Sequence, residues 1–416
     1  MIIQEYISYV KNKSFPFPVE SSLKKISEER ELALTVCKSH KVYGFNTLPG
    51  HRDSESIDEI NILDFQKELI ASHNISNGNK YSDSTISYFI FCKLYSLNNS
   101  KTGISPSAYE AVFNMYKNGD GVAYQGASYS CGDVIPAASL FKNIKNLSKG
   151  DAMSLINGNF IHVGLCLSLS EKLNNTWVSY KHQTNEWLKL VPTNKGIINN
   201  ALIDLKKIGI TTRYNIKTVQ DPVSIRALPD IFHTLLKNIN NFFSEITRLM
   251  NTPSGNPLFD FHQMEPLSQG SYMSPSLSLI TSTLIDSILL LLWSIDSRTK
   301  YILSGKVEHI SKDNADKGTL GLIQFPKLMT AKLETARRKF SSRVFVTGSN
   351  TSYGTEDLWS FGLDIAEELS AILEITDSVL ELERKVLNSI KKSQPRKKLP
   401  DLFQDIANST SLKKLF

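Results

Sequence analysis

Apolar residues recur at helical spacing through the second half of the chain. Between residues 229 and 250 they fall at intervals that place them on one face of a long helix: Ile231, Phe232, Leu235, Leu236, Ile239, Phe242, Phe243, Ile246 and Leu249. Segments 276–304, 317–340 and 355–391 are also predicted to be helices, and Pro395 is expected to end the last one. The pattern therefore predicts a mostly α protein built on a bundle of long helices.

The first half shows weaker periodicity. Residues 1–100 alternate short apolar runs with polar turns. Ser105 and Pro106 provide a cap and first turn for a helix over Ala108–Lys117, which Asn118-Gly119 is expected to stop. We expect an N-terminal domain over residues 1–229, carrying most candidate site residues, and a long-helix bundle with a C-terminal tail over residues 230–416.

Bulk composition is that of an ordinary globular protein. The chain has 416 residues, 41% of them hydrophobic and 21% charged, with a net charge of +6. Acids and bases are intermixed, so nucleic acid is not an expected partner. The apolar segment Leu277–Ile295 is interrupted by serine, threonine and aspartate, which favours a buried bundle helix over a membrane span.

Cysteine usage and the N-terminus indicate a cytoplasmic protein. Cys37, Cys92, Cys131 and Cys166 show no metal-ligand spacing, and so few cysteines in a long chain predict no disulfide framework. No basic segment followed by an apolar run opens the sequence, so no signal peptide is expected. We expect no metal site.

The stretch from Gly126 to Pro136 carries the strongest candidate chemistry. At its centre Ser130-Cys131-Gly132 can cyclise if the Gly132 nitrogen attacks the Ser130 carbonyl carbon. Loss of water and of the Cys131 thiol would give an electrophilic methylidene-imidazolone. Glycine suits the strained turn that this attack needs, because it has no Cβ. Taken alone, the same residues are also typical of a plain turn.

Further short blocks accompany this stretch in a defined order: Tyr43–Thr47, Ser72-His73, Leu155–Gly158, Val219–Arg226, Asn256-Pro257, Ser268–Tyr272 and Thr355–Gly362. Together they resemble the histidine/phenylalanine/tyrosine ammonia-lyase family. That family's pattern includes Tyr-Gly-x-Asn-Thr, Ser-His, Ala-Ser-Gly-Asp, Asn-Gly, Gln-Asp-x-x-Ser-x-Arg and Glu-Asp. The resemblance covers most of the chain. It implies a central helical bundle of the aromatic amino acid ammonia-lyase type, assembled as a homotetramer with active sites at subunit junctions.

The resemblance also implies roles for individual residues. The cofactor would be 4-methylidene-imidazol-5-one, formed autocatalytically from Ser130, Cys131 and Gly132. Tyr43 would be the base that removes the β-proton, a task that requires a phenol pKa below its usual value of about 10. In isolation Tyr43 is more typical of a core tyrosine. Tyr272 would be the aromatic residue near the cofactor.

Polar residues further along match the substrate-binding positions. Arg226 would pair bidentately with the substrate carboxylate. Gln220 and Asn157 would orient the amino group and the cofactor ring, and Asp133 would support the cyclised loop. Read alone, Asn157-Gly158 is a turn and Arg226 a surface charge.

Ser72, His73 and Glu356 bear on the choice of substrate. Phenylalanine-specific relatives carry an apolar pair where Ser72-His73 stands, and tyrosine-specific ones place a histidine first. The Ser-His pair with Glu356 therefore resembles the histidine lyases, whose polar pocket holds an imidazole by hydrogen bonds. The alternative for His73 is a structural role at a helix end.

Several positions depart from the family pattern. Val223 replaces a tyrosine, Ser271 an asparagine, Met273 and Leu358 a histidine, and Tyr129 a glycine, while Ser130-Cys131 replaces Ala-Ser. The chain is also shorter than its relatives between Gly132 and Asn157 and after Gly362. Three hypotheses follow: a cytoplasmic ammonia-lyase converting L-histidine to trans-urocanate, an aminomutase or specialised lyase with the same cofactor, and an inactive relative acting as a binding protein.

Overall fold

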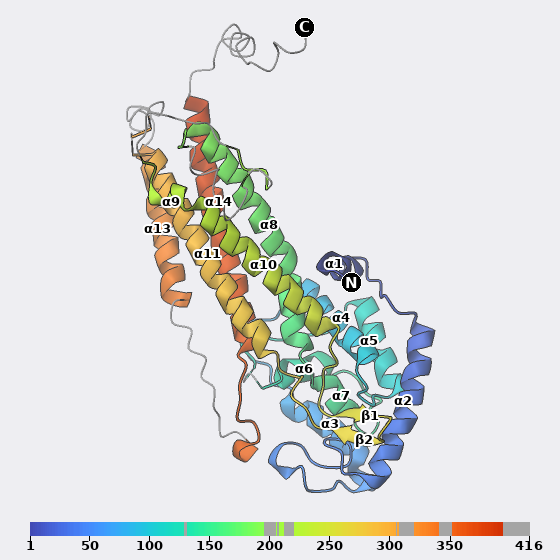
Figure 1. The fold of residues 1–416 in the computed structure, drawn as a ribbon. Coiled ribbons are helices and arrows are strands. Elements are labelled where there is room, and N and C mark those ends of the chain that lie inside the picture. Colours follow the sequence, from blue (N-terminus) through green and yellow to red (C-terminus); the bar gives the residue numbers. More distant parts are fainter. Residues whose placement is uncertain are drawn as a thin grey trace, which may run out of the picture. The chain divides into compact units, whose positions relative to one another are not determined.

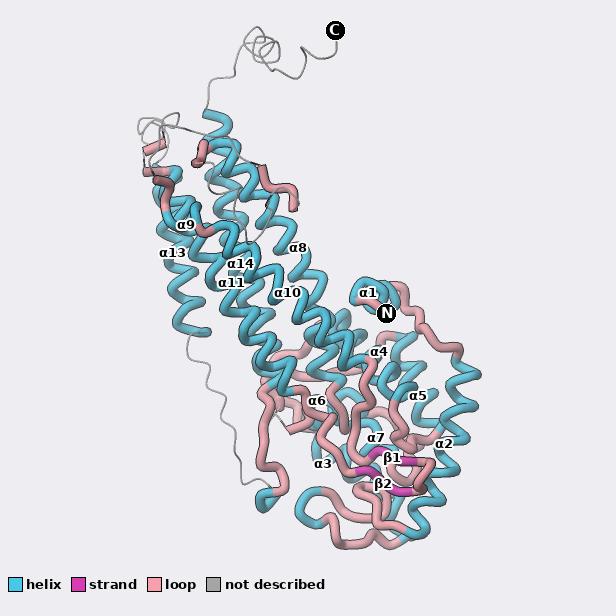
Figure 2. The backbone as a smooth tube through the Cα atoms, in the orientation of Figure 1, coloured by secondary structure: helices cyan, strands magenta, loops and turns pink. Residues whose placement is uncertain are grey.

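The computed structural model describes residues 1–128, 131–194, 205, 208–211, 220–304, 306–307, 320–340 and 352–393. Within them the chain is mostly helical (Figures 1 and 2). The shorter N-terminal helices are α1 (Ile3–Lys11), α2 (Val19–Ser39), α3 (Ile62–His73), α4 (Asp83–Asn99), α5 (Pro106–Asn118), α6 (Val134–Phe141) and α7 (Asp151–Ile156).

Longer helices follow, together with one short helix and a hairpin. The helices are α8 (Phe160–Leu190), α9 (Val223–Arg226), α10 (Leu228–Met250), α11 (Pro275–Ile302), α13 (Leu320–Phe340) and α14 (Gly362–Ser393). Strands β1 (Leu258–Asp260) and β2 (Glu265–Leu267) pair antiparallel, with Phe259 opposite Pro266. Single 3₁₀ turns are η1 (Gly50–Arg52), η2 (Glu59–Asn61) and η4 (Ser352–Gly354).

The chain divides into two compact units, each assembled from three segments. Unit 1 comprises Met1–Val178, Phe232–Leu289 and Ala336–Glu374, and unit 2 comprises Ser179–Ile231, Leu290–Thr335 and Ile375–Phe416. Neither unit is one continuous stretch of sequence. The domain boundary expected at residue 229 stays a prediction.

Long helices pack on one another within each unit. In unit 1, Trp177 of α8 meets Phe232 of α10 edge to face at 5.4 Å, and the Asn238 amide of α10 donates to Ser287 of α11. In unit 2, the Trp187 indole N–H of α8 donates to the main-chain oxygen of Arg298 on α11. The long-helix bundle predicted from the apolar spacing is confirmed.

Most of the predicted helix boundaries agree with the structure. The predicted cap of α5 is present, since the Ser105 hydroxyl accepts from the Ala108 N–H and Gly119 ends the helix with φ of 80°. The last predicted helix begins later than expected. Phe361 has φ of 47°, which breaks the helical path, so α14 starts at Gly362 and not near residue 355.

The N-terminal hundred residues differ from the sequence expectation, because helices α1 to α4 fill most of them. Helix α4 is buried on nearly every side from Ile86 to Asn98. Such a helix has no polar face, so its sequence lacks the one-sided period that identifies a surface helix.

Two helical stretches of the described chain are long and apolar enough for a membrane span, judged by length and composition alone. They are Asp151–Leu190 and Pro275–Ile302. In the first, 89% of the most apolar window is buried inside the protein. Core helices of soluble proteins pass the same test, so this observation is weak evidence for a membrane.

Candidate active site

A cavity of about 330 Å³ in unit 1 brings together side chains from distant parts of the sequence. Six of the candidate residues line it: Tyr43, His73, Cys131, Asn157, Tyr272 and Glu356. They come from six separate sequence blocks, and tertiary folding alone makes them neighbours. The cavity is the candidate active site.

The loop after α2 carries Tyr43. The Asn46 side chain shapes this loop: its oxygen accepts from the Val42 N–H at 2.7 Å, and its amide donates to the main-chain oxygens of Cys37 and His40. Gly44 has φ of 68°, and a Cβ there would lie 2.8 Å from the Met153 side chain. The asparagine and glycine of the Tyr43–Thr47 block are therefore needed to hold the loop against α7.

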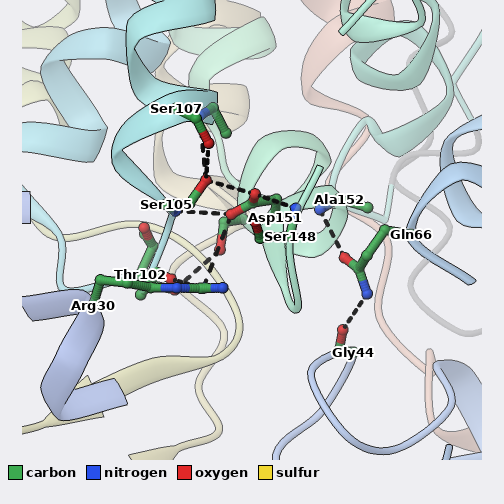
Figure 3. A network of polar contacts seen from close by, with 12 residues as sticks. Arg30, Gly44, Gln66, Thr102, Ser105, Ser107, Ser148, Asp151 and Ala152 are labelled. Atoms are coloured by element: carbon green, nitrogen blue, oxygen red, sulfur yellow. Dashed lines mark hydrogen bonds and ion pairs between the residues drawn. The ribbon is translucent and has the colours of Figure 1, made fainter. Parts of the chain in front are cut away.

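A buried polar network joins the Tyr43 loop, α3, α5 and α7 (Figure 3). The Gln66 oxygen of α3 accepts from the Ala152 N–H at 2.9 Å, and its amide nitrogen donates to the Gly44 carbonyl at 3.4 Å. The Asp151 carboxylate accepts from the Ser105 hydroxyl and N–H, at 2.7 and 2.8 Å. These contacts fix α7, which leads directly into Asn157.

The electrostatic surroundings of Tyr43 differ from those expected of a base. Its hydroxyl accepts a hydrogen bond from the Gly50 N–H at 3.1 Å. Burial raises the pKa of the Tyr43 phenol, the Gly50 N–H opposes this, and the negative charge of Glu356 raises it further. The structure without substrate therefore does not show the lowered pKa that a base requires, and the role of Tyr43 stays a prediction.

Cys131 and Gly132 pack against Tyr272. Cys131 is buried, and burial followed by the charge of Glu356 raises the pKa of its thiol to about 11, against the opposing effect of a hydrogen bond with Tyr272. Gly132 has φ of 83°, and a Cβ there would lie 3.0 Å from the Tyr272 ring. The backbone is thus held in the left-handed region that favours glycine. Ser130 and Tyr129 lie outside the described residues.

Asp133 closes the turn and begins α6. It is buried with φ of 47°, and its carboxylate accepts from the Ser128 hydroxyl at 2.7 Å. Burial raises the pKa of Asp133 to about 6, the Ser128 hydrogen bond opposes the shift, and the charges of Asp364 and Glu367 add to it. Asp133 therefore connects both sides of the candidate cyclising residues.

Asn157 follows the last residue of α7 and is buried. Its amide nitrogen lies 3.9 Å from the Met153 sulfur, whereas its side-chain oxygen has no hydrogen-bond partner among the described residues. A buried amide oxygen without a partner is costly. It is therefore available to a ligand in the cavity.

His73 has a structural contact as well as a place in the cavity wall. Its Nδ1 donates to the Leu69 carbonyl at 2.8 Å at the end of α3, and because a carbonyl only accepts, this nitrogen carries the proton. In the neutral ring Nε2 is then an acceptor. Ser72 is exposed, bonds to the same carbonyl at 3.1 Å and does not line the cavity.

The charged residues of the cavity wall are acidic. Glu356 and Asp53 line it, and no lysine or arginine is among its described lining residues. Sequence reasoning missed two lining residues: His51, which lies in η1, and Asp53, which follows η1. The available signal was their position a few residues after the Tyr43–Thr47 block. The cavity thus suits a cationic or hydrogen-bonding ligand.

Arg226 and Gln220 are not brought to this cavity. Both belong to unit 2 and are exposed, Arg226 as the last residue of α9. Val223, at one of the departures from the family pattern, is 68% exposed and is not among the residues that line the cavity. Among the described residues no cluster of histidine, cysteine and acidic side chains could hold a metal ion.

Comparison with known proteins gives one family. The family model described as aromatic amino acid lyase matches residues 16–145 and 168–388. A histidine ammonia-lyase of Desulfotalea psychrophila is 22% identical over 393 residues, covering 82% of this chain and 76% of the relative.

Solved structures share the fold. The phenylalanine aminomutase of Pantoea agglomerans superposes with a TM-score of 0.82 at 16% identity, covering 97% of this chain and 92% of the other. The ergothionase of Treponema denticola, an ergothioneine-degrading enzyme, has a TM-score of 0.80 at 14% identity, covering 96% and 90%.

Proposed function

This chain belongs to the aromatic amino acid lyase family of carbon–nitrogen lyases, and we propose that it eliminates ammonia from L-histidine to give trans-urocanate. The observation that carries the proposal is the convergence of Tyr43, Cys131 and Glu356 on one cavity, in which Asn157 offers an unpartnered buried oxygen. Tyr43, Asn157 and Glu356 stand where the sequence blocks match the family pattern, and Cys131 stands where the family has the serine of Ala-Ser-Gly.

The proposed electrophile is a 4-methylidene-imidazol-5-one formed from Ser130, Cys131 and Gly132. Its formation joins the Gly132 nitrogen to the Ser130 carbonyl carbon with loss of one water, and elimination at Cys131 releases one hydrogen sulfide. The left-handed Gly132 supports this assignment, as does the lack of space for a Cβ against Tyr272. Once formed, the group supplies an electrophilic carbon that makes the substrate's amine a better leaving group.

Tyr43 is the proposed base. Burial and the negative charge of Glu356 disfavour its ionised form, the phenolate. A substrate ammonium beside these groups adds a positive charge and lowers the pKa of the phenol, so proton removal is coupled to substrate binding. The Gly50 N–H, which donates to the Tyr43 oxygen, stabilises the phenolate in the same way.

The polar wall supports an imidazole substrate. His73 keeps its proton on Nδ1, so its other ring nitrogen can accept a hydrogen bond, and the Glu356 carboxylate can accept another. A phenyl ring offers no N–H donor to either acceptor. Histidine is therefore favoured over phenylalanine.

The substrate carboxylate needs a cation that the described cavity wall does not supply. We assign this role to Arg226, with Gln220 beside it, from a second copy of the chain in a cytoplasmic homotetramer with shared active sites. The exposed position of Arg226 supports this assignment, and so do the exposed apolar side chains of α11, namely Leu279, Leu290 and Trp293. The four free cysteines support a cytoplasmic location.

Intact mass and turnover test the reaction. The purified protein should weigh less than its sequence by one hydrogen sulfide and one water, with the deficit on the peptide holding residues 130–132, and histidine should yield a conjugated acid absorbing in the ultraviolet. An unmodified mass with a free Cys131 thiol would contradict the lyase proposal. It would instead support the inactive binding protein.

Product analysis separates lyase from aminomutase. A cyclised protein that converts an amino acid into its β-isomer without releasing ammonia would be an aminomutase. A cyclised protein that turns over other amino acids but not histidine would be a specialised lyase.

Complementation tests the shared site. Tyr43→Phe and Arg226→Ala variants should each lose most of the activity alone. If one cavity takes Tyr43 from one copy and Arg226 from another, co-refolded mixtures should regain part of the activity. Mixtures that stay inactive while forming mixed oligomers would place both residues in the same copy or remove Arg226 from the site.

A further inference from the structure

A lysine side chain is buried in the middle of α4. Lys93 is 1% exposed in a helix whose residues from Ile86 to Asn98 are nearly all buried. Lysine is almost never fully buried unless it is paired. Lys93 forms no ion pair within the described part of the chain, and burial is the one cause that lowers its pKa to about 7.

The Lys93 ammonium contacts the segment after α7 and the first residue of α8. Its Nζ donates to the main-chain oxygen of Asn157 at 2.9 Å and lies 4.6 Å from the centre of the Phe160 ring. Gly158, between them, has φ of 135°, and a Cβ there would lie 3.8 Å from Nζ. Lys93 therefore fixes the orientation of the Asn157–Gly158 peptide, at a point where glycine leaves the backbone free to rotate.

The same turn is held from its other side by Ser254. The Ser254 hydroxyl accepts from the Asn159 N–H at 3.0 Å and donates to the Ser271 carbonyl, next to Tyr272, also at 3.0 Å. Lys93 and Ser254 together set the position of Asn157 relative to Tyr272 in the cavity wall.

We infer that Lys93 is a positioning residue for the elimination reaction, holding Asn157 through its main-chain oxygen so that the side-chain amide points into the cavity. The inference rests on the proposed lyase function. Lys93 contributes unfavourably to folding, because an ammonium without a carboxylate partner is expensive to bury. Active sites often keep a residue that increases activity although it lowers the stability of the fold.

The test is Lys93→Met, which fills nearly the same space without the charge. We expect its melting temperature to rise while kcat for the favoured amino acid falls about 100-fold, as for a small displacement of an aligned group. KM should change less than kcat, because Lys93 does not touch the substrate. A structural lysine would behave differently: its loss would lower stability and activity together.

The pH dependence of the stability gained in Lys93→Met tests whether the gain comes from removing a buried ammonium. A lysine whose pKa falls from 10.5 to about 7 on folding binds fewer protons when folded, so its stability cost is full at and below pH 7 and disappears toward pH 10.5. The difference in melting temperature between Lys93→Met and wild type should shrink over this window. No other titratable group contributes to the pKa of Lys93 in the described chain.

Lys13→Met is the matched control. The Lys13 Nζ also donates to a main-chain oxygen, that of Tyr116 at 3.3 Å, and lies 5.3 Å from the Tyr116 ring centre, away from the cavity. Its kcat should equal that of the wild type. An active wild type with an equally active Lys93→Met would overturn this inference alone, and so would a Lys93→Met variant that loses stability. An uncyclised, inactive wild type would instead contradict the proposed function.

Discussion

The Tyr43 hydroxyl accepts a hydrogen bond from the Gly50 N–H at 3.1 Å, so a nearby backbone group of the same chain segment holds the side chain of the proposed base. Burial and the carboxylate of Glu356 oppose ionisation of the same hydroxyl. One backbone donor thus favours the phenolate, whereas burial and the nearby acidic groups, Glu356 foremost, disfavour it. The balance among them governs the pH range in which Tyr43 can act.

Removing the charge of Glu356 should shift the pH profile. A neighbouring carboxylate disfavours the phenolate, so Glu356→Gln lowers the pKa of Tyr43 and moves the rise of kcat/KM with pH to lower pH. The position of the profile is the readout, because its height also reflects substrate binding. Asp53→Asn should move it in the same direction by less. Tyr43→Phe should lose about 100- to 10,000-fold in rate, and an unshifted profile in Glu356→Gln would argue against Tyr43 as the base.

Gly132→Ala should prevent formation of the electrophile. The backbone φ of 83° is strained for alanine, and the new Cβ would lie 3.0 Å from the Tyr272 ring. Gly126→Ala is the control in the same loop, since φ is 64° there but nothing lies within 4 Å of a Cβ. Each variant should lose about 1 to 3 kcal/mol of stability. Intact mass should show cyclised protein for Gly126→Ala and none for Gly132→Ala; equal cyclisation would contradict the role of the tight turn.

Asp133→Asn should stabilise the protein above about pH 6. The folded pKa of Asp133 is raised from 3.8 to about 6, so the folded state binds its proton more tightly and loses stability as pH rises between these values. The asparagine oxygen can still accept from the Ser128 hydroxyl. Melting temperatures should therefore coincide near pH 4 and diverge by pH 7. The charges of Asp364 and Glu367 face the same carboxyl, so an Asp364→Asn variant should reduce the difference.

Removing one partner of the buried Arg298–Glu383 pair of unit 2 should lower the free energy of unfolding far more than removing one partner of an exposed pair. Arg298 contacts Glu383 at 2.6 and 2.7 Å and donates to Thr184, and both charged side chains are fully buried. Arg298→Met leaves a buried carboxylate unpaired and should cost about 3 to 5 kcal/mol in the free energy of unfolding. The double variant Arg298→Met, Glu383→Leu should recover most of the lost free energy of unfolding.

The exposed Arg384–Glu381 pair provides the comparison. Its contacts are 2.8 Å, but both side chains are largely in solvent. Arg384→Met should change the free energy of unfolding by less than about 1 kcal/mol in the same denaturant titration. Equal costs for the two arginine variants would show that burial of the Arg298 pair is incomplete in solution.

Local sequence determined the elements whose pattern is one-sided or capped. The apolar stripe of α10 and the Ser105 cap and Gly119 stop of α5 each depend on residues close in sequence, so they could be predicted. Helix α4 and the first turns of α8 could not be. Ile161, Val163 and Leu165 are all buried, and a helical stretch surrounded by protein has no polar face to mark its period.

The ordered blocks also determined most of the candidate site, because six of the eleven residues chosen from the sequence line one cavity. What only the tertiary structure decided is their electrostatics. Burial and the proximity of Glu356 raise the pKa of Tyr43, and neither can be read from residues 313 positions apart in sequence. Lys93 shows the same limit: its importance lies in one contact with Asn157, and a lysine within an apolar run carries no sign of that contact until the chain is folded.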